Sequence, residues 1–228
     1  MAQKKVLVVL TNVSKYPNAK RATGLWLGEA VHFAKKIESA GLKVDYLSPS
    51  GGYVPIDPHC FELADDTDWE WYQNPSFLKQ LGNTLKPSEV KPEDYSAIYY
   101  AGGHGTIWDF PDNKELQEIS AKIYANGGVV SSVCHGALGL LGIKDQSGEL
   151  LIKNKKVTGF SNEEEHLVGL DKIVPFLTET ELSKRGANYV KAPEPWAEFA
   201  VVDGRLVTGQ NPASGAAVAT KVLEVLKH

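Results

Sequence analysis

The residue that most clearly suggests chemistry is Cys134, which His135 follows directly. It comes after Val129–Val133, a run with the length and β-branched composition of a buried strand, and a predicted helix begins at His135. A side chain at such a turn is held at the edge of a sheet, beside the unpaired N–H groups of the first helical turn. These donors favour an anion, so we expect a lowered pKa for Cys134 and a thiolate nucleophile. The alternative is a small buried core thiol.

Gly102 and Gly103 follow another predicted strand, the third along the chain, over residues 97–101. Their N–H groups can approach a ligand closely, and with the N–H of His135 they could cradle an oxyanion. An ordinary tight glycine turn is the alternative. Neither a G-x-G-x-x-G nor a Walker pattern follows the first strand, which disfavours a nucleotide or phosphate loop.

Glu29 lies near the start of a predicted helix over residues 25–40, among apolar neighbours. It is either a solvated first-turn residue that the helix dipole favours, or a carboxyl group whose pKa burial raises. In the second case it could exchange a proton with a substrate. The sequence leaves both interpretations open.

Two further side chains could assist the thiol. Glu165 could orient the ring of His135, although a run of glutamates beside a serine is typical of a helix N-terminus. His104 could be a donor that faces a ligand, but a satisfied loop histidine is favoured. The second cysteine, Cys60, is predicted to be structural, because it and His59 lack the further ligands of a zinc site.

The elements that must position these residues alternate along the chain. Strands are predicted at 4–11, 43–47, 97–101 and 129–133, and helices at 25–40, 112–124 and 213–226. Residues 49–95 are predicted to be an irregular excursion from the sheet, with a short helix near 77–81. In the last third we expect a hairpin of 150–152 with 156–158, a short helix that begins with a capping box at Thr178 to Glu181, and a second hairpin around Asp203-Gly204. This order predicts an α/β fold with a mostly parallel sheet in a single domain, residues 1–228.

Composition excludes several classes of protein. The 228 residues carry a net charge of −4, with 43% hydrophobic and 23% charged residues, as in an ordinary globular chain. No basic block is present, so nucleic acid is not an expected partner, and no apolar run is long enough to span a membrane. Two cysteines do not make a disulfide framework, and a reactive thiol fits a reducing compartment, so we expect the cytoplasm.

Several motifs together carry a family resemblance. They are Ala101-Gly102-Gly103-His104-Gly105, Val133-Cys134-His135-Gly136 and the helical Glu29. More specific marks are Thr106 with Asp109 and Pro111, Thr158-Gly159-Phe160, Pro195-Trp196, Asp203-Gly204-Arg205 and Asn211-Pro212. On these marks the chain resembles the ThiJ/PfpI superfamily, whose fold is shared with class I glutamine amidotransferases, and within it the stress-chaperone/glyoxalase III branch. One departure is Ala137, where that branch tends to have proline.

The resemblance implies a flavodoxin-like three-layer sandwich and a triad of Cys134, His135 and Glu165. Glu29 matches the glutamate that contacts the nucleophile in this family, and Gly103 with His135 would supply the oxyanion donors. The family's activities include glutathione-independent conversion of methylglyoxal to D-lactate, deglycation of proteins, holdase chaperoning and peptidase action. Superfamily members are commonly homodimers, so we expect a homodimer.

The leading hypothesis is a glyoxalase III without metal or organic cofactor. Cys134 would attack the aldehyde to give a hemithioacetal, and Glu29 or His135 would move a proton through an enediol. Two alternatives use the same thiol differently. One is an amidase, peptidase or deglycase that acts by acyl transfer. The other is a stress protein that binds unfolded chains or senses oxidation at Cys134.

Overall fold

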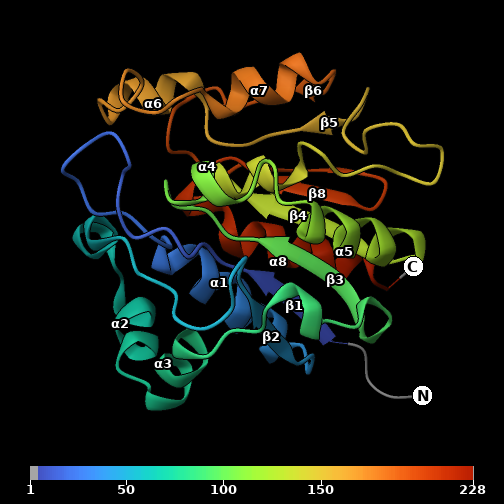
Figure 1. Ribbon diagram of the computed structural model, residues 1–228, viewed down its shortest axis with the longest axis horizontal. Helices are drawn as coiled ribbons and strands as arrows, with labels where there is room; N and C mark the ends of the chain where they lie inside the picture. The colour runs from blue at the N-terminus through green and yellow to red at the C-terminus, as the bar shows by residue number, and fades with distance from the viewer. Residues whose placement is uncertain (1–4, 228) are drawn as a thin grey trace.

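A six-stranded sheet forms the centre of the computed structural model, which describes residues 5–227 (Figure 1). Its strands are β1 (Lys5–Val9), β2 (Val44–Leu47), β3 (Tyr95–Tyr100), β4 (Val129–Val133), β7 (Ala200–Asp203) and β8 (Leu206–Gly209). The order is β2-β1-β3-β4-β8-β7, and every neighbouring pair is parallel except β7 with β8. The expected α/β sandwich with a mostly parallel sheet is therefore confirmed. Residue 4 of the first predicted strand lies outside the described residues.

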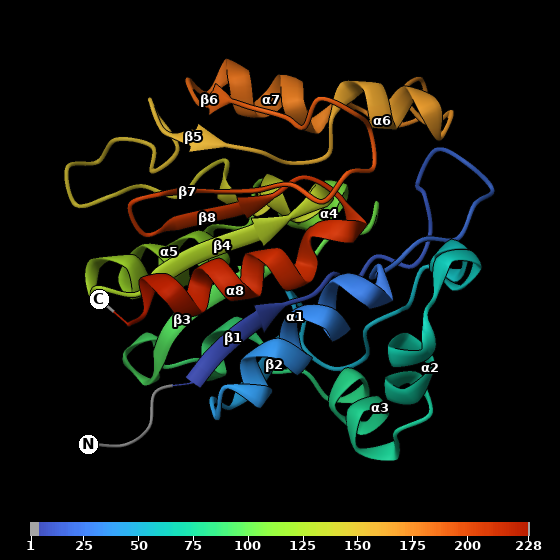
Figure 2. The ribbon, with the colours of Figure 1, turned by 180° about the vertical axis from the view of Figure 1, so that it is seen from behind.

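Both faces of the sheet are buried, as alternation along β1 shows. Val6 and Val8 join one apolar cluster, whereas Leu7 and Val9 join another on the opposite face. The helices on the first face are α1 (Leu27–Ser39) and α8 (Gly215–Val225), and α5 (Lys114–Ala125) lies on the second. Figure 2 shows α1 and α8 side by side over the first face. A continuous apolar strand is the pattern expected for this double coverage.

The remaining elements surround this core. They are the helices α2 (Asp66–Tyr72), α3 (Pro75–Gly82), α4 (Thr106–Asp109), α6 (Asn162–Leu167) and α7 (Thr178–Lys184), the 3-10 helices η1 (Pro58–Leu63), η2 (Pro87–Glu89), η3 (Pro92–Asp94), η4 (Cys134–Leu140) and η5 (Pro212–Ser214), and the parallel pair β5 (Lys156–Val157) and β6 (Asn188–Tyr189). Within the described part of the chain, no helix is both long enough and apolar enough to cross a membrane.

The excursion over residues 49–95 leaves the sheet as predicted, but it is more regular than expected. It contains α2, which was not predicted, and α3, which confirms the short helix predicted near 77–81 and extends it in both directions. The Asp65 side chain caps α2, and Asn74 followed by Pro75 begins α3. Both are ordinary helix-capping signals. The aromatic residues nearby favoured the interpretation of this segment as irregular. The assignment of residues 1–228 to a single domain stays a prediction, and residues 1–4 and 228 lie outside the described range.

Of the local predictions in the last third, one is wrong, one is partly confirmed and one is confirmed. Residues 150–152 do not pair with 156–158. Instead Lys156–Val157 pairs with Asn188–Tyr189, and Leu150 bridges Lys144. The short helix predicted at Thr178 forms as α7, but it begins after Leu177 without a side-chain cap, so the predicted capping box is absent. The hairpin around Asp203-Gly204 forms as expected and adds β7 antiparallel to β8.

An aromatic stack joins α1 to the middle of the sheet. The Phe33 ring lies 3.6 Å from the Tyr99 ring, centroid to centroid, and the planes are nearly parallel. The Tyr99 hydroxyl donates a hydrogen bond of 2.9 Å to the carbonyl oxygen of Glu29. Strand β3 therefore fixes both the position and the rotation of α1.

We expect Phe33→Ala to lower the free energy of unfolding by about 3–5 kcal/mol, the usual effect of emptying a large buried aromatic site. Denaturant unfolding followed by circular dichroism measures this difference. Lys36→Ala, on the exposed side of the same helix, is the control and should change stability by less than about 0.5 kcal/mol. Equal effects of the two substitutions would contradict the role given to the stack.

Candidate active site

Cys134 lies at a sharp turn between β4 and η4. Its φ angle is 56°, in the left-handed region that non-glycine residues seldom adopt. The turn lies directly against β3, because a Cβ atom on Gly136 would collide with the carbonyl oxygen of Tyr100. The Phe160 N–H donates to the carbonyl oxygen of Cys134 from the other side. The strained residue is thus held by packing on both sides, as is common at functional sites.

Glu29 projects from α1 to the sulfur of Cys134. Its carboxyl group is fully buried, and the Cys134 thiol lies in contact with it. The Gly102 N–H donates a hydrogen bond of 2.6 Å to Oε2 of Glu29. Among the described residues, Oε1 has no nitrogen or oxygen partner. Of the two interpretations that the sequence left open for Glu29, the structure supports the buried carboxyl group.

Burial shifts the pKa of both members of this pair. Loss of water raises the pKa of Glu29 to about 8, although its contacts with Cys134 and Gly102 oppose the shift. Burial and the neighbouring Glu29 carboxyl also raise the pKa of the Cys134 thiol well above its usual range. The expected lowering of the thiol pKa is therefore wrong for the resting protein. The N–H donors near the sulfur do not offset the removal of water and the nearby carboxyl group.

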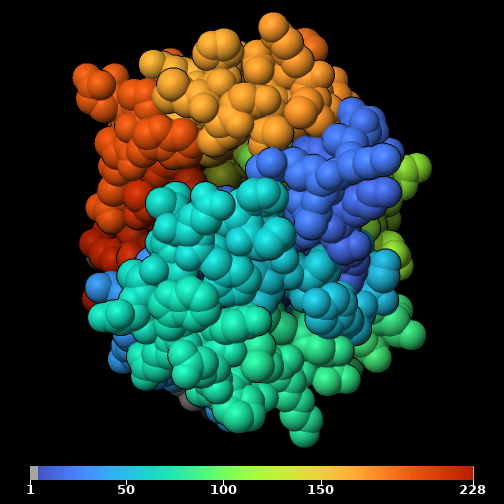
Figure 3. Space-filling view, turned by 90° about the vertical axis from the view of Figure 1, so that its left-hand side faces the viewer, coloured from blue at the N-terminus to red at the C-terminus, as the bar shows by residue number. Residues whose placement is uncertain are grey.

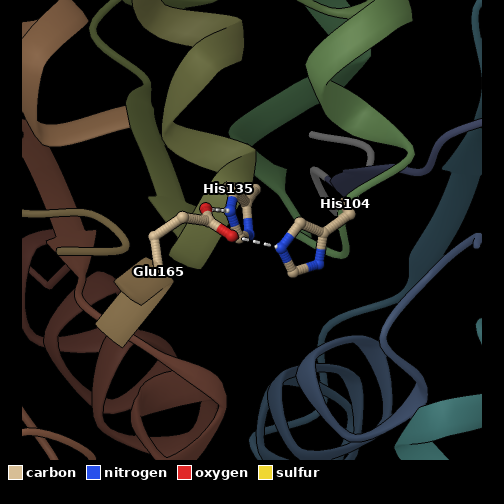
Figure 4. A group of neighbouring side chains, drawn as sticks. All are labelled: His104, His135 and Glu165. Atoms are coloured by element: carbon tan, nitrogen blue, oxygen red, sulfur yellow. Dashed lines mark hydrogen bonds and ion pairs between the residues drawn. The ribbon is translucent and has the colours of Figure 1, made fainter. Parts of the chain in front are cut away.

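A hydrogen-bonded chain runs from the Cys134 sulfur through His135 to Glu165. Figure 4 shows the part of it in which Glu165 meets His135 and His104. Nδ1 of His135 lies 3.4 Å from the Cys134 sulfur, and Nε2 lies 2.6 Å from Oε2 of Glu165. Nε2 of His104 lies 2.7 Å from Oε1 of the same carboxylate. Glu165 thus bridges two imidazole rings, and the His135 ring has one nitrogen toward the thiol and the other toward a carboxylate.

The bridging carboxylate is held in its charged form. Burial opposes ionisation of Glu165, but His135 and His104 outweigh it and lower the pKa of this carboxyl group well below its usual value. Burial, with the neighbouring His135, lowers the pKa of His104. The three side chains also offer two nitrogens and one oxygen within 4.8 Å of one another, a set that could hold a metal ion. In the present arrangement short hydrogen bonds link these same atoms.

Three consecutive glutamates on α6 have three different environments. Glu163 is exposed and pairs with Lys191 across 3.1 Å. Glu164 forms a capping box with Ser161 at the start of the helix. Because Glu164 takes the capping role, Glu165 is free to reach His135. Both interpretations of this glutamate run are therefore supported. Glu164 marks the helix N-terminus, and Glu165 orients the His135 ring.

The Glu164 carboxylate also joins the segments around the site. It is buried and accepts hydrogen bonds from the Trp196 N–H and from the side-chain amides of Gln210 and Asn211. Trp196 has a φ angle of 65°, so its backbone is strained where this bond holds it. These contacts were not predicted from the sequence. A polar Gln210-Asn211 pair directly after a buried strand was the signal that could have indicated them.

The Cys134 sulfur lies at a cavity of about 470 Å³. Its floor includes Gly103, His104 and His135, and its other lining residues are Trp26, Leu63, Phe160, Val168, Trp196, Asn211, Pro212 and Ala213. Figure 3 shows a hollow where the blue, cyan and orange segments meet, which include Trp26, Leu63 and Val168. Cys134 is only 3% exposed, but a small molecule in this cavity would reach it.

The structure brings Cys134, His135, Glu165 and Glu29 together, as the family resemblance implied. Gly102 needs a correction, because its N–H donates to Glu29 and is not free to bind an oxyanion. Gly103 and His135 line the cavity, and their role as oxyanion donors stays a prediction. His104 has a hydrogen-bond partner within the protein, as predicted. That partner is Glu165, so His104 belongs to the site. Cys60 is buried in the same apolar cluster as Cys134, and it does not line the cavity.

Comparisons with known proteins cover almost the whole chain. The sequence profile of the DJ-1/PfpI family matches residues 22–225. Glutathione-independent glyoxalase HSP31 of Saccharomyces cerevisiae is 37% identical over 240 residues, with 100% of both chains aligned. Among solved structures, glyoxalase III of Candida albicans has a TM-score of 0.90 and 35% identity over 98% of this chain and 97% of its own. The Rapid Encystment Protein of 24 kDa from Francisella tularensis has a TM-score of 0.93 and 37% identity, covering 98% and 99%.

The raised pKa of Glu29 predicts how stability depends on pH. Between the ordinary value of 4.5 and about 8, the folded protein holds a proton that the unfolded chain has lost, so stability falls as pH rises. Glu29→Gln removes this titration. We expect the stability of the variant relative to the parent to increase by about 3 kcal/mol from about pH 5 to about pH 7.5.

Urea unfolding at several pH values measures this slope, which is independent of any constant packing effect of the amide. Substitution of the exposed Glu62 by Gln is the control and should leave the slope unchanged. A constant offset between Glu29→Gln and the parent at all pH values would contradict a raised pKa at this site.

Proposed function

Because the chain belongs to the DJ-1/PfpI family, we propose that it is a glutathione-independent glyoxalase that converts methylglyoxal to D-lactate. The observation that carries the proposal is the sulfur of Cys134 between two proton carriers, Glu29 and His135, at the floor of a cavity. The names of full-length relatives, glutathione-independent glyoxalase and glyoxalase III, support the same activity. The substrate is then a small reactive aldehyde, and the thiol supplies the covalent step.

The first step of the proposed reaction uses both carriers. His135 accepts the thiol proton at Nδ1, and the imidazolium is stabilised by the Glu165 carboxylate. The sulfur attacks the aldehyde carbon, and Glu29 gives its proton to the aldehyde oxygen, which forms a hemithioacetal. A thiol that is protonated at rest needs such a base, so the raised pKa of Cys134 agrees with this order.

The second step moves a proton between the two carbonyl carbons of the substrate. The Glu29 carboxylate removes the hydrogen from the former aldehyde carbon while His135 gives its proton to the ketone oxygen, which forms an enediol. His135 then takes the proton from the hydroxyl on the carbon that carries the sulfur, and Glu29 returns its proton to the neighbouring carbon. The hemithioacetal carbon is oxidised to a thioester while the ketone carbon is reduced to an alcohol, so no external oxidant is required. Water then hydrolyses the thioester, which releases the hydroxy acid and restores the thiol. A carboxyl pKa of about 8 suits a group that both gives and takes a proton near neutral pH.

The size of the cavity favours a second candidate substrate for the same site. Its 470 Å³ are more than methylglyoxal fills, and Leu63, Val168 and Trp196 on its lining are all exposed apolar side chains. A methylglyoxal adduct on a protein side chain could enter as well, which is deglycase chemistry. The homodimer, the unfolded-protein partner and the cytoplasmic location stay predictions.

We expect Cys134→Ala to lower kcat/KM for glutathione-free D-lactate formation at least about a thousandfold, since the nucleophile is lost. Glu29→Gln should lower it by about 10²–10⁴-fold through loss of proton transfer. An assay of D-lactate from methylglyoxal with purified protein measures both. Cys60→Ala, which removes the other thiol, is the matched control and should keep the parental rate. Substantial turnover by Cys134→Ala would sink the proposal.

His104 is expected to position Glu165 for His135. His104→Ala removes a hydrogen bond to a charged group and should lower kcat/KM by about ten- to a hundredfold. His104→Gln keeps a donor near the carboxylate and should recover part of this loss. The same D-lactate assay, with kcat and KM determined separately, tests the pair. Equal activities of His104→Gln and His104→Ala would argue against a hydrogen-bonding role.

A further inference from the structure

A second group of metal-ligating side chains lies outside the cavity. Its members come from α1 and from the start of α2, the helices labelled in Figure 2. It consists of His32 on α1, Asp65 directly before α2, and Asp68 in the first turn of α2. One ligand atom from each residue lies within 4.8 Å of the other two. We propose that these three side chains bind a divalent transition-metal ion of the zinc type.

The distances fit a metal ion better than a direct ion pair. Nε2 of His32 lies 3.2 Å from Oδ2 of Asp65 and 3.3 Å from Oδ1 of Asp68. Two ligand atoms on a tetrahedral zinc ion, each about 2.0–2.1 Å from the metal, are separated by about 3.3 Å. Among the described residues, Nε2 of His32 forms no hydrogen bond of acceptable geometry despite these distances. The ring nitrogen is therefore close to one oxygen of each carboxylate and hydrogen-bonded to neither.

The capping box of α2 prepares the two carboxylates for this role. Oδ1 of Asp65 accepts from the Asp68 N–H, and Oδ2 of Asp68 accepts from the Asp65 N–H. Each carboxylate is thus fixed by one oxygen and directs the other toward His32. Hydrogen bonds that orient ligands in this way are typical of the surroundings of metal sites.

Burial singles out one oxygen of this group, Oδ1 of Asp68. The residue is 5% exposed, and its Oδ1 is buried with no hydrogen-bond donor in the part of the chain that the structure describes. A buried carboxylate oxygen without a donor is unfavourable, and a cation would remove that cost. The Asp65 side chain, in contrast, is 57% exposed, so an ion could enter past it and keep a water molecule as its fourth ligand.

The donor set also selects the kind of ion. One imidazole and two carboxylates balance the charge of a divalent cation. Imidazole suits zinc and related transition metals, whereas magnesium and calcium prefer oxygen ligands alone. The bound ion would fix α2 to α1, the helix that carries Glu29 three residues before His32. The alternative to a metal ion is a proton on His32. The resulting imidazolium would form ion pairs with both Asp65 and Asp68.

Zinc titration by calorimetry tests the proposal with zinc chloride itself as the probe. The full chain should carry Cys134→Ala and Glu165→Gln, so that ligands of the other site do not contribute. In this background we expect one zinc ion per chain, with binding weakened at least about tenfold by His32→Gln or by Asp68→Asn. Asp66→Asn makes the same charge change on an exposed neighbour in the same turn and should bind within about twofold of the background.

Cobalt(II) added to the otherwise unchanged protein gives a second measurement that does not depend on the background substitutions. We expect the visible absorption of tetrahedral cobalt, reduced by His32→Gln and retained by Asp66→Asn. Zinc affinity that is equal in all variants would overturn the proposal. So would a cobalt spectrum that does not differ from that of the ion in water.

Discussion

Burial of one carboxyl group, that of Glu29, constrains the rest of the site. Because its charge cannot be solvated, the group keeps its proton near neutral pH, and the sulfur beside it also keeps one. Removing the thiol proton therefore needs a base, and the structure supplies it on the opposite side, as His135 backed by the ionised Glu165. The resting site thus stores its negative charge on Glu165, away from the sulfur, and the charge distribution changes when a reaction begins.

The position of Glu29 depends on the sheet rather than on its own helix. Tyr99 of β3 stacks on Phe33 and holds the Glu29 carbonyl, while Gly102 after the same strand binds the carboxyl group. The strand therefore determines both where α1 lies and how its buried acid is directed. On the other side of the sulfur, Glu164 links α6 to the segments at 196 and 210–211. Two buried carboxyl groups thus hold the site from its two sides. Glu29 is neutral, and Glu164 accepts hydrogen bonds from four donors.

The sequence predicted the parts of the molecule that obey short-range rules. Buried strands, the helices over the sheet and the turn at Asp203-Gly204 follow from periodicity and turn chemistry, and the elbow at Cys134 follows from a strand that ends in cysteine. What it could not supply depends on contacts between distant residues. The partner of Lys156–Val157 lies more than 30 residues away, the solvation of the thiol depends on α1, and the partner of His104 is on α6. Resemblance to a family supplied Glu165, because spacing alone does not distinguish it from its two neighbours.

The residues that line the cavity come from different segments of the chain than some of the reacting groups, and this affects how related proteins can diverge. The reacting groups come from loops at the edge of the sheet and from α1 and α6, whereas Leu63 comes from the excursion that begins after β2 and returns at β3. Mutations in that excursion can reshape the entrance without moving the sulfur or its proton carriers. Substrate preference and reactivity can therefore evolve separately, so proteins with the same catalytic residues need not share the same preferred aldehyde.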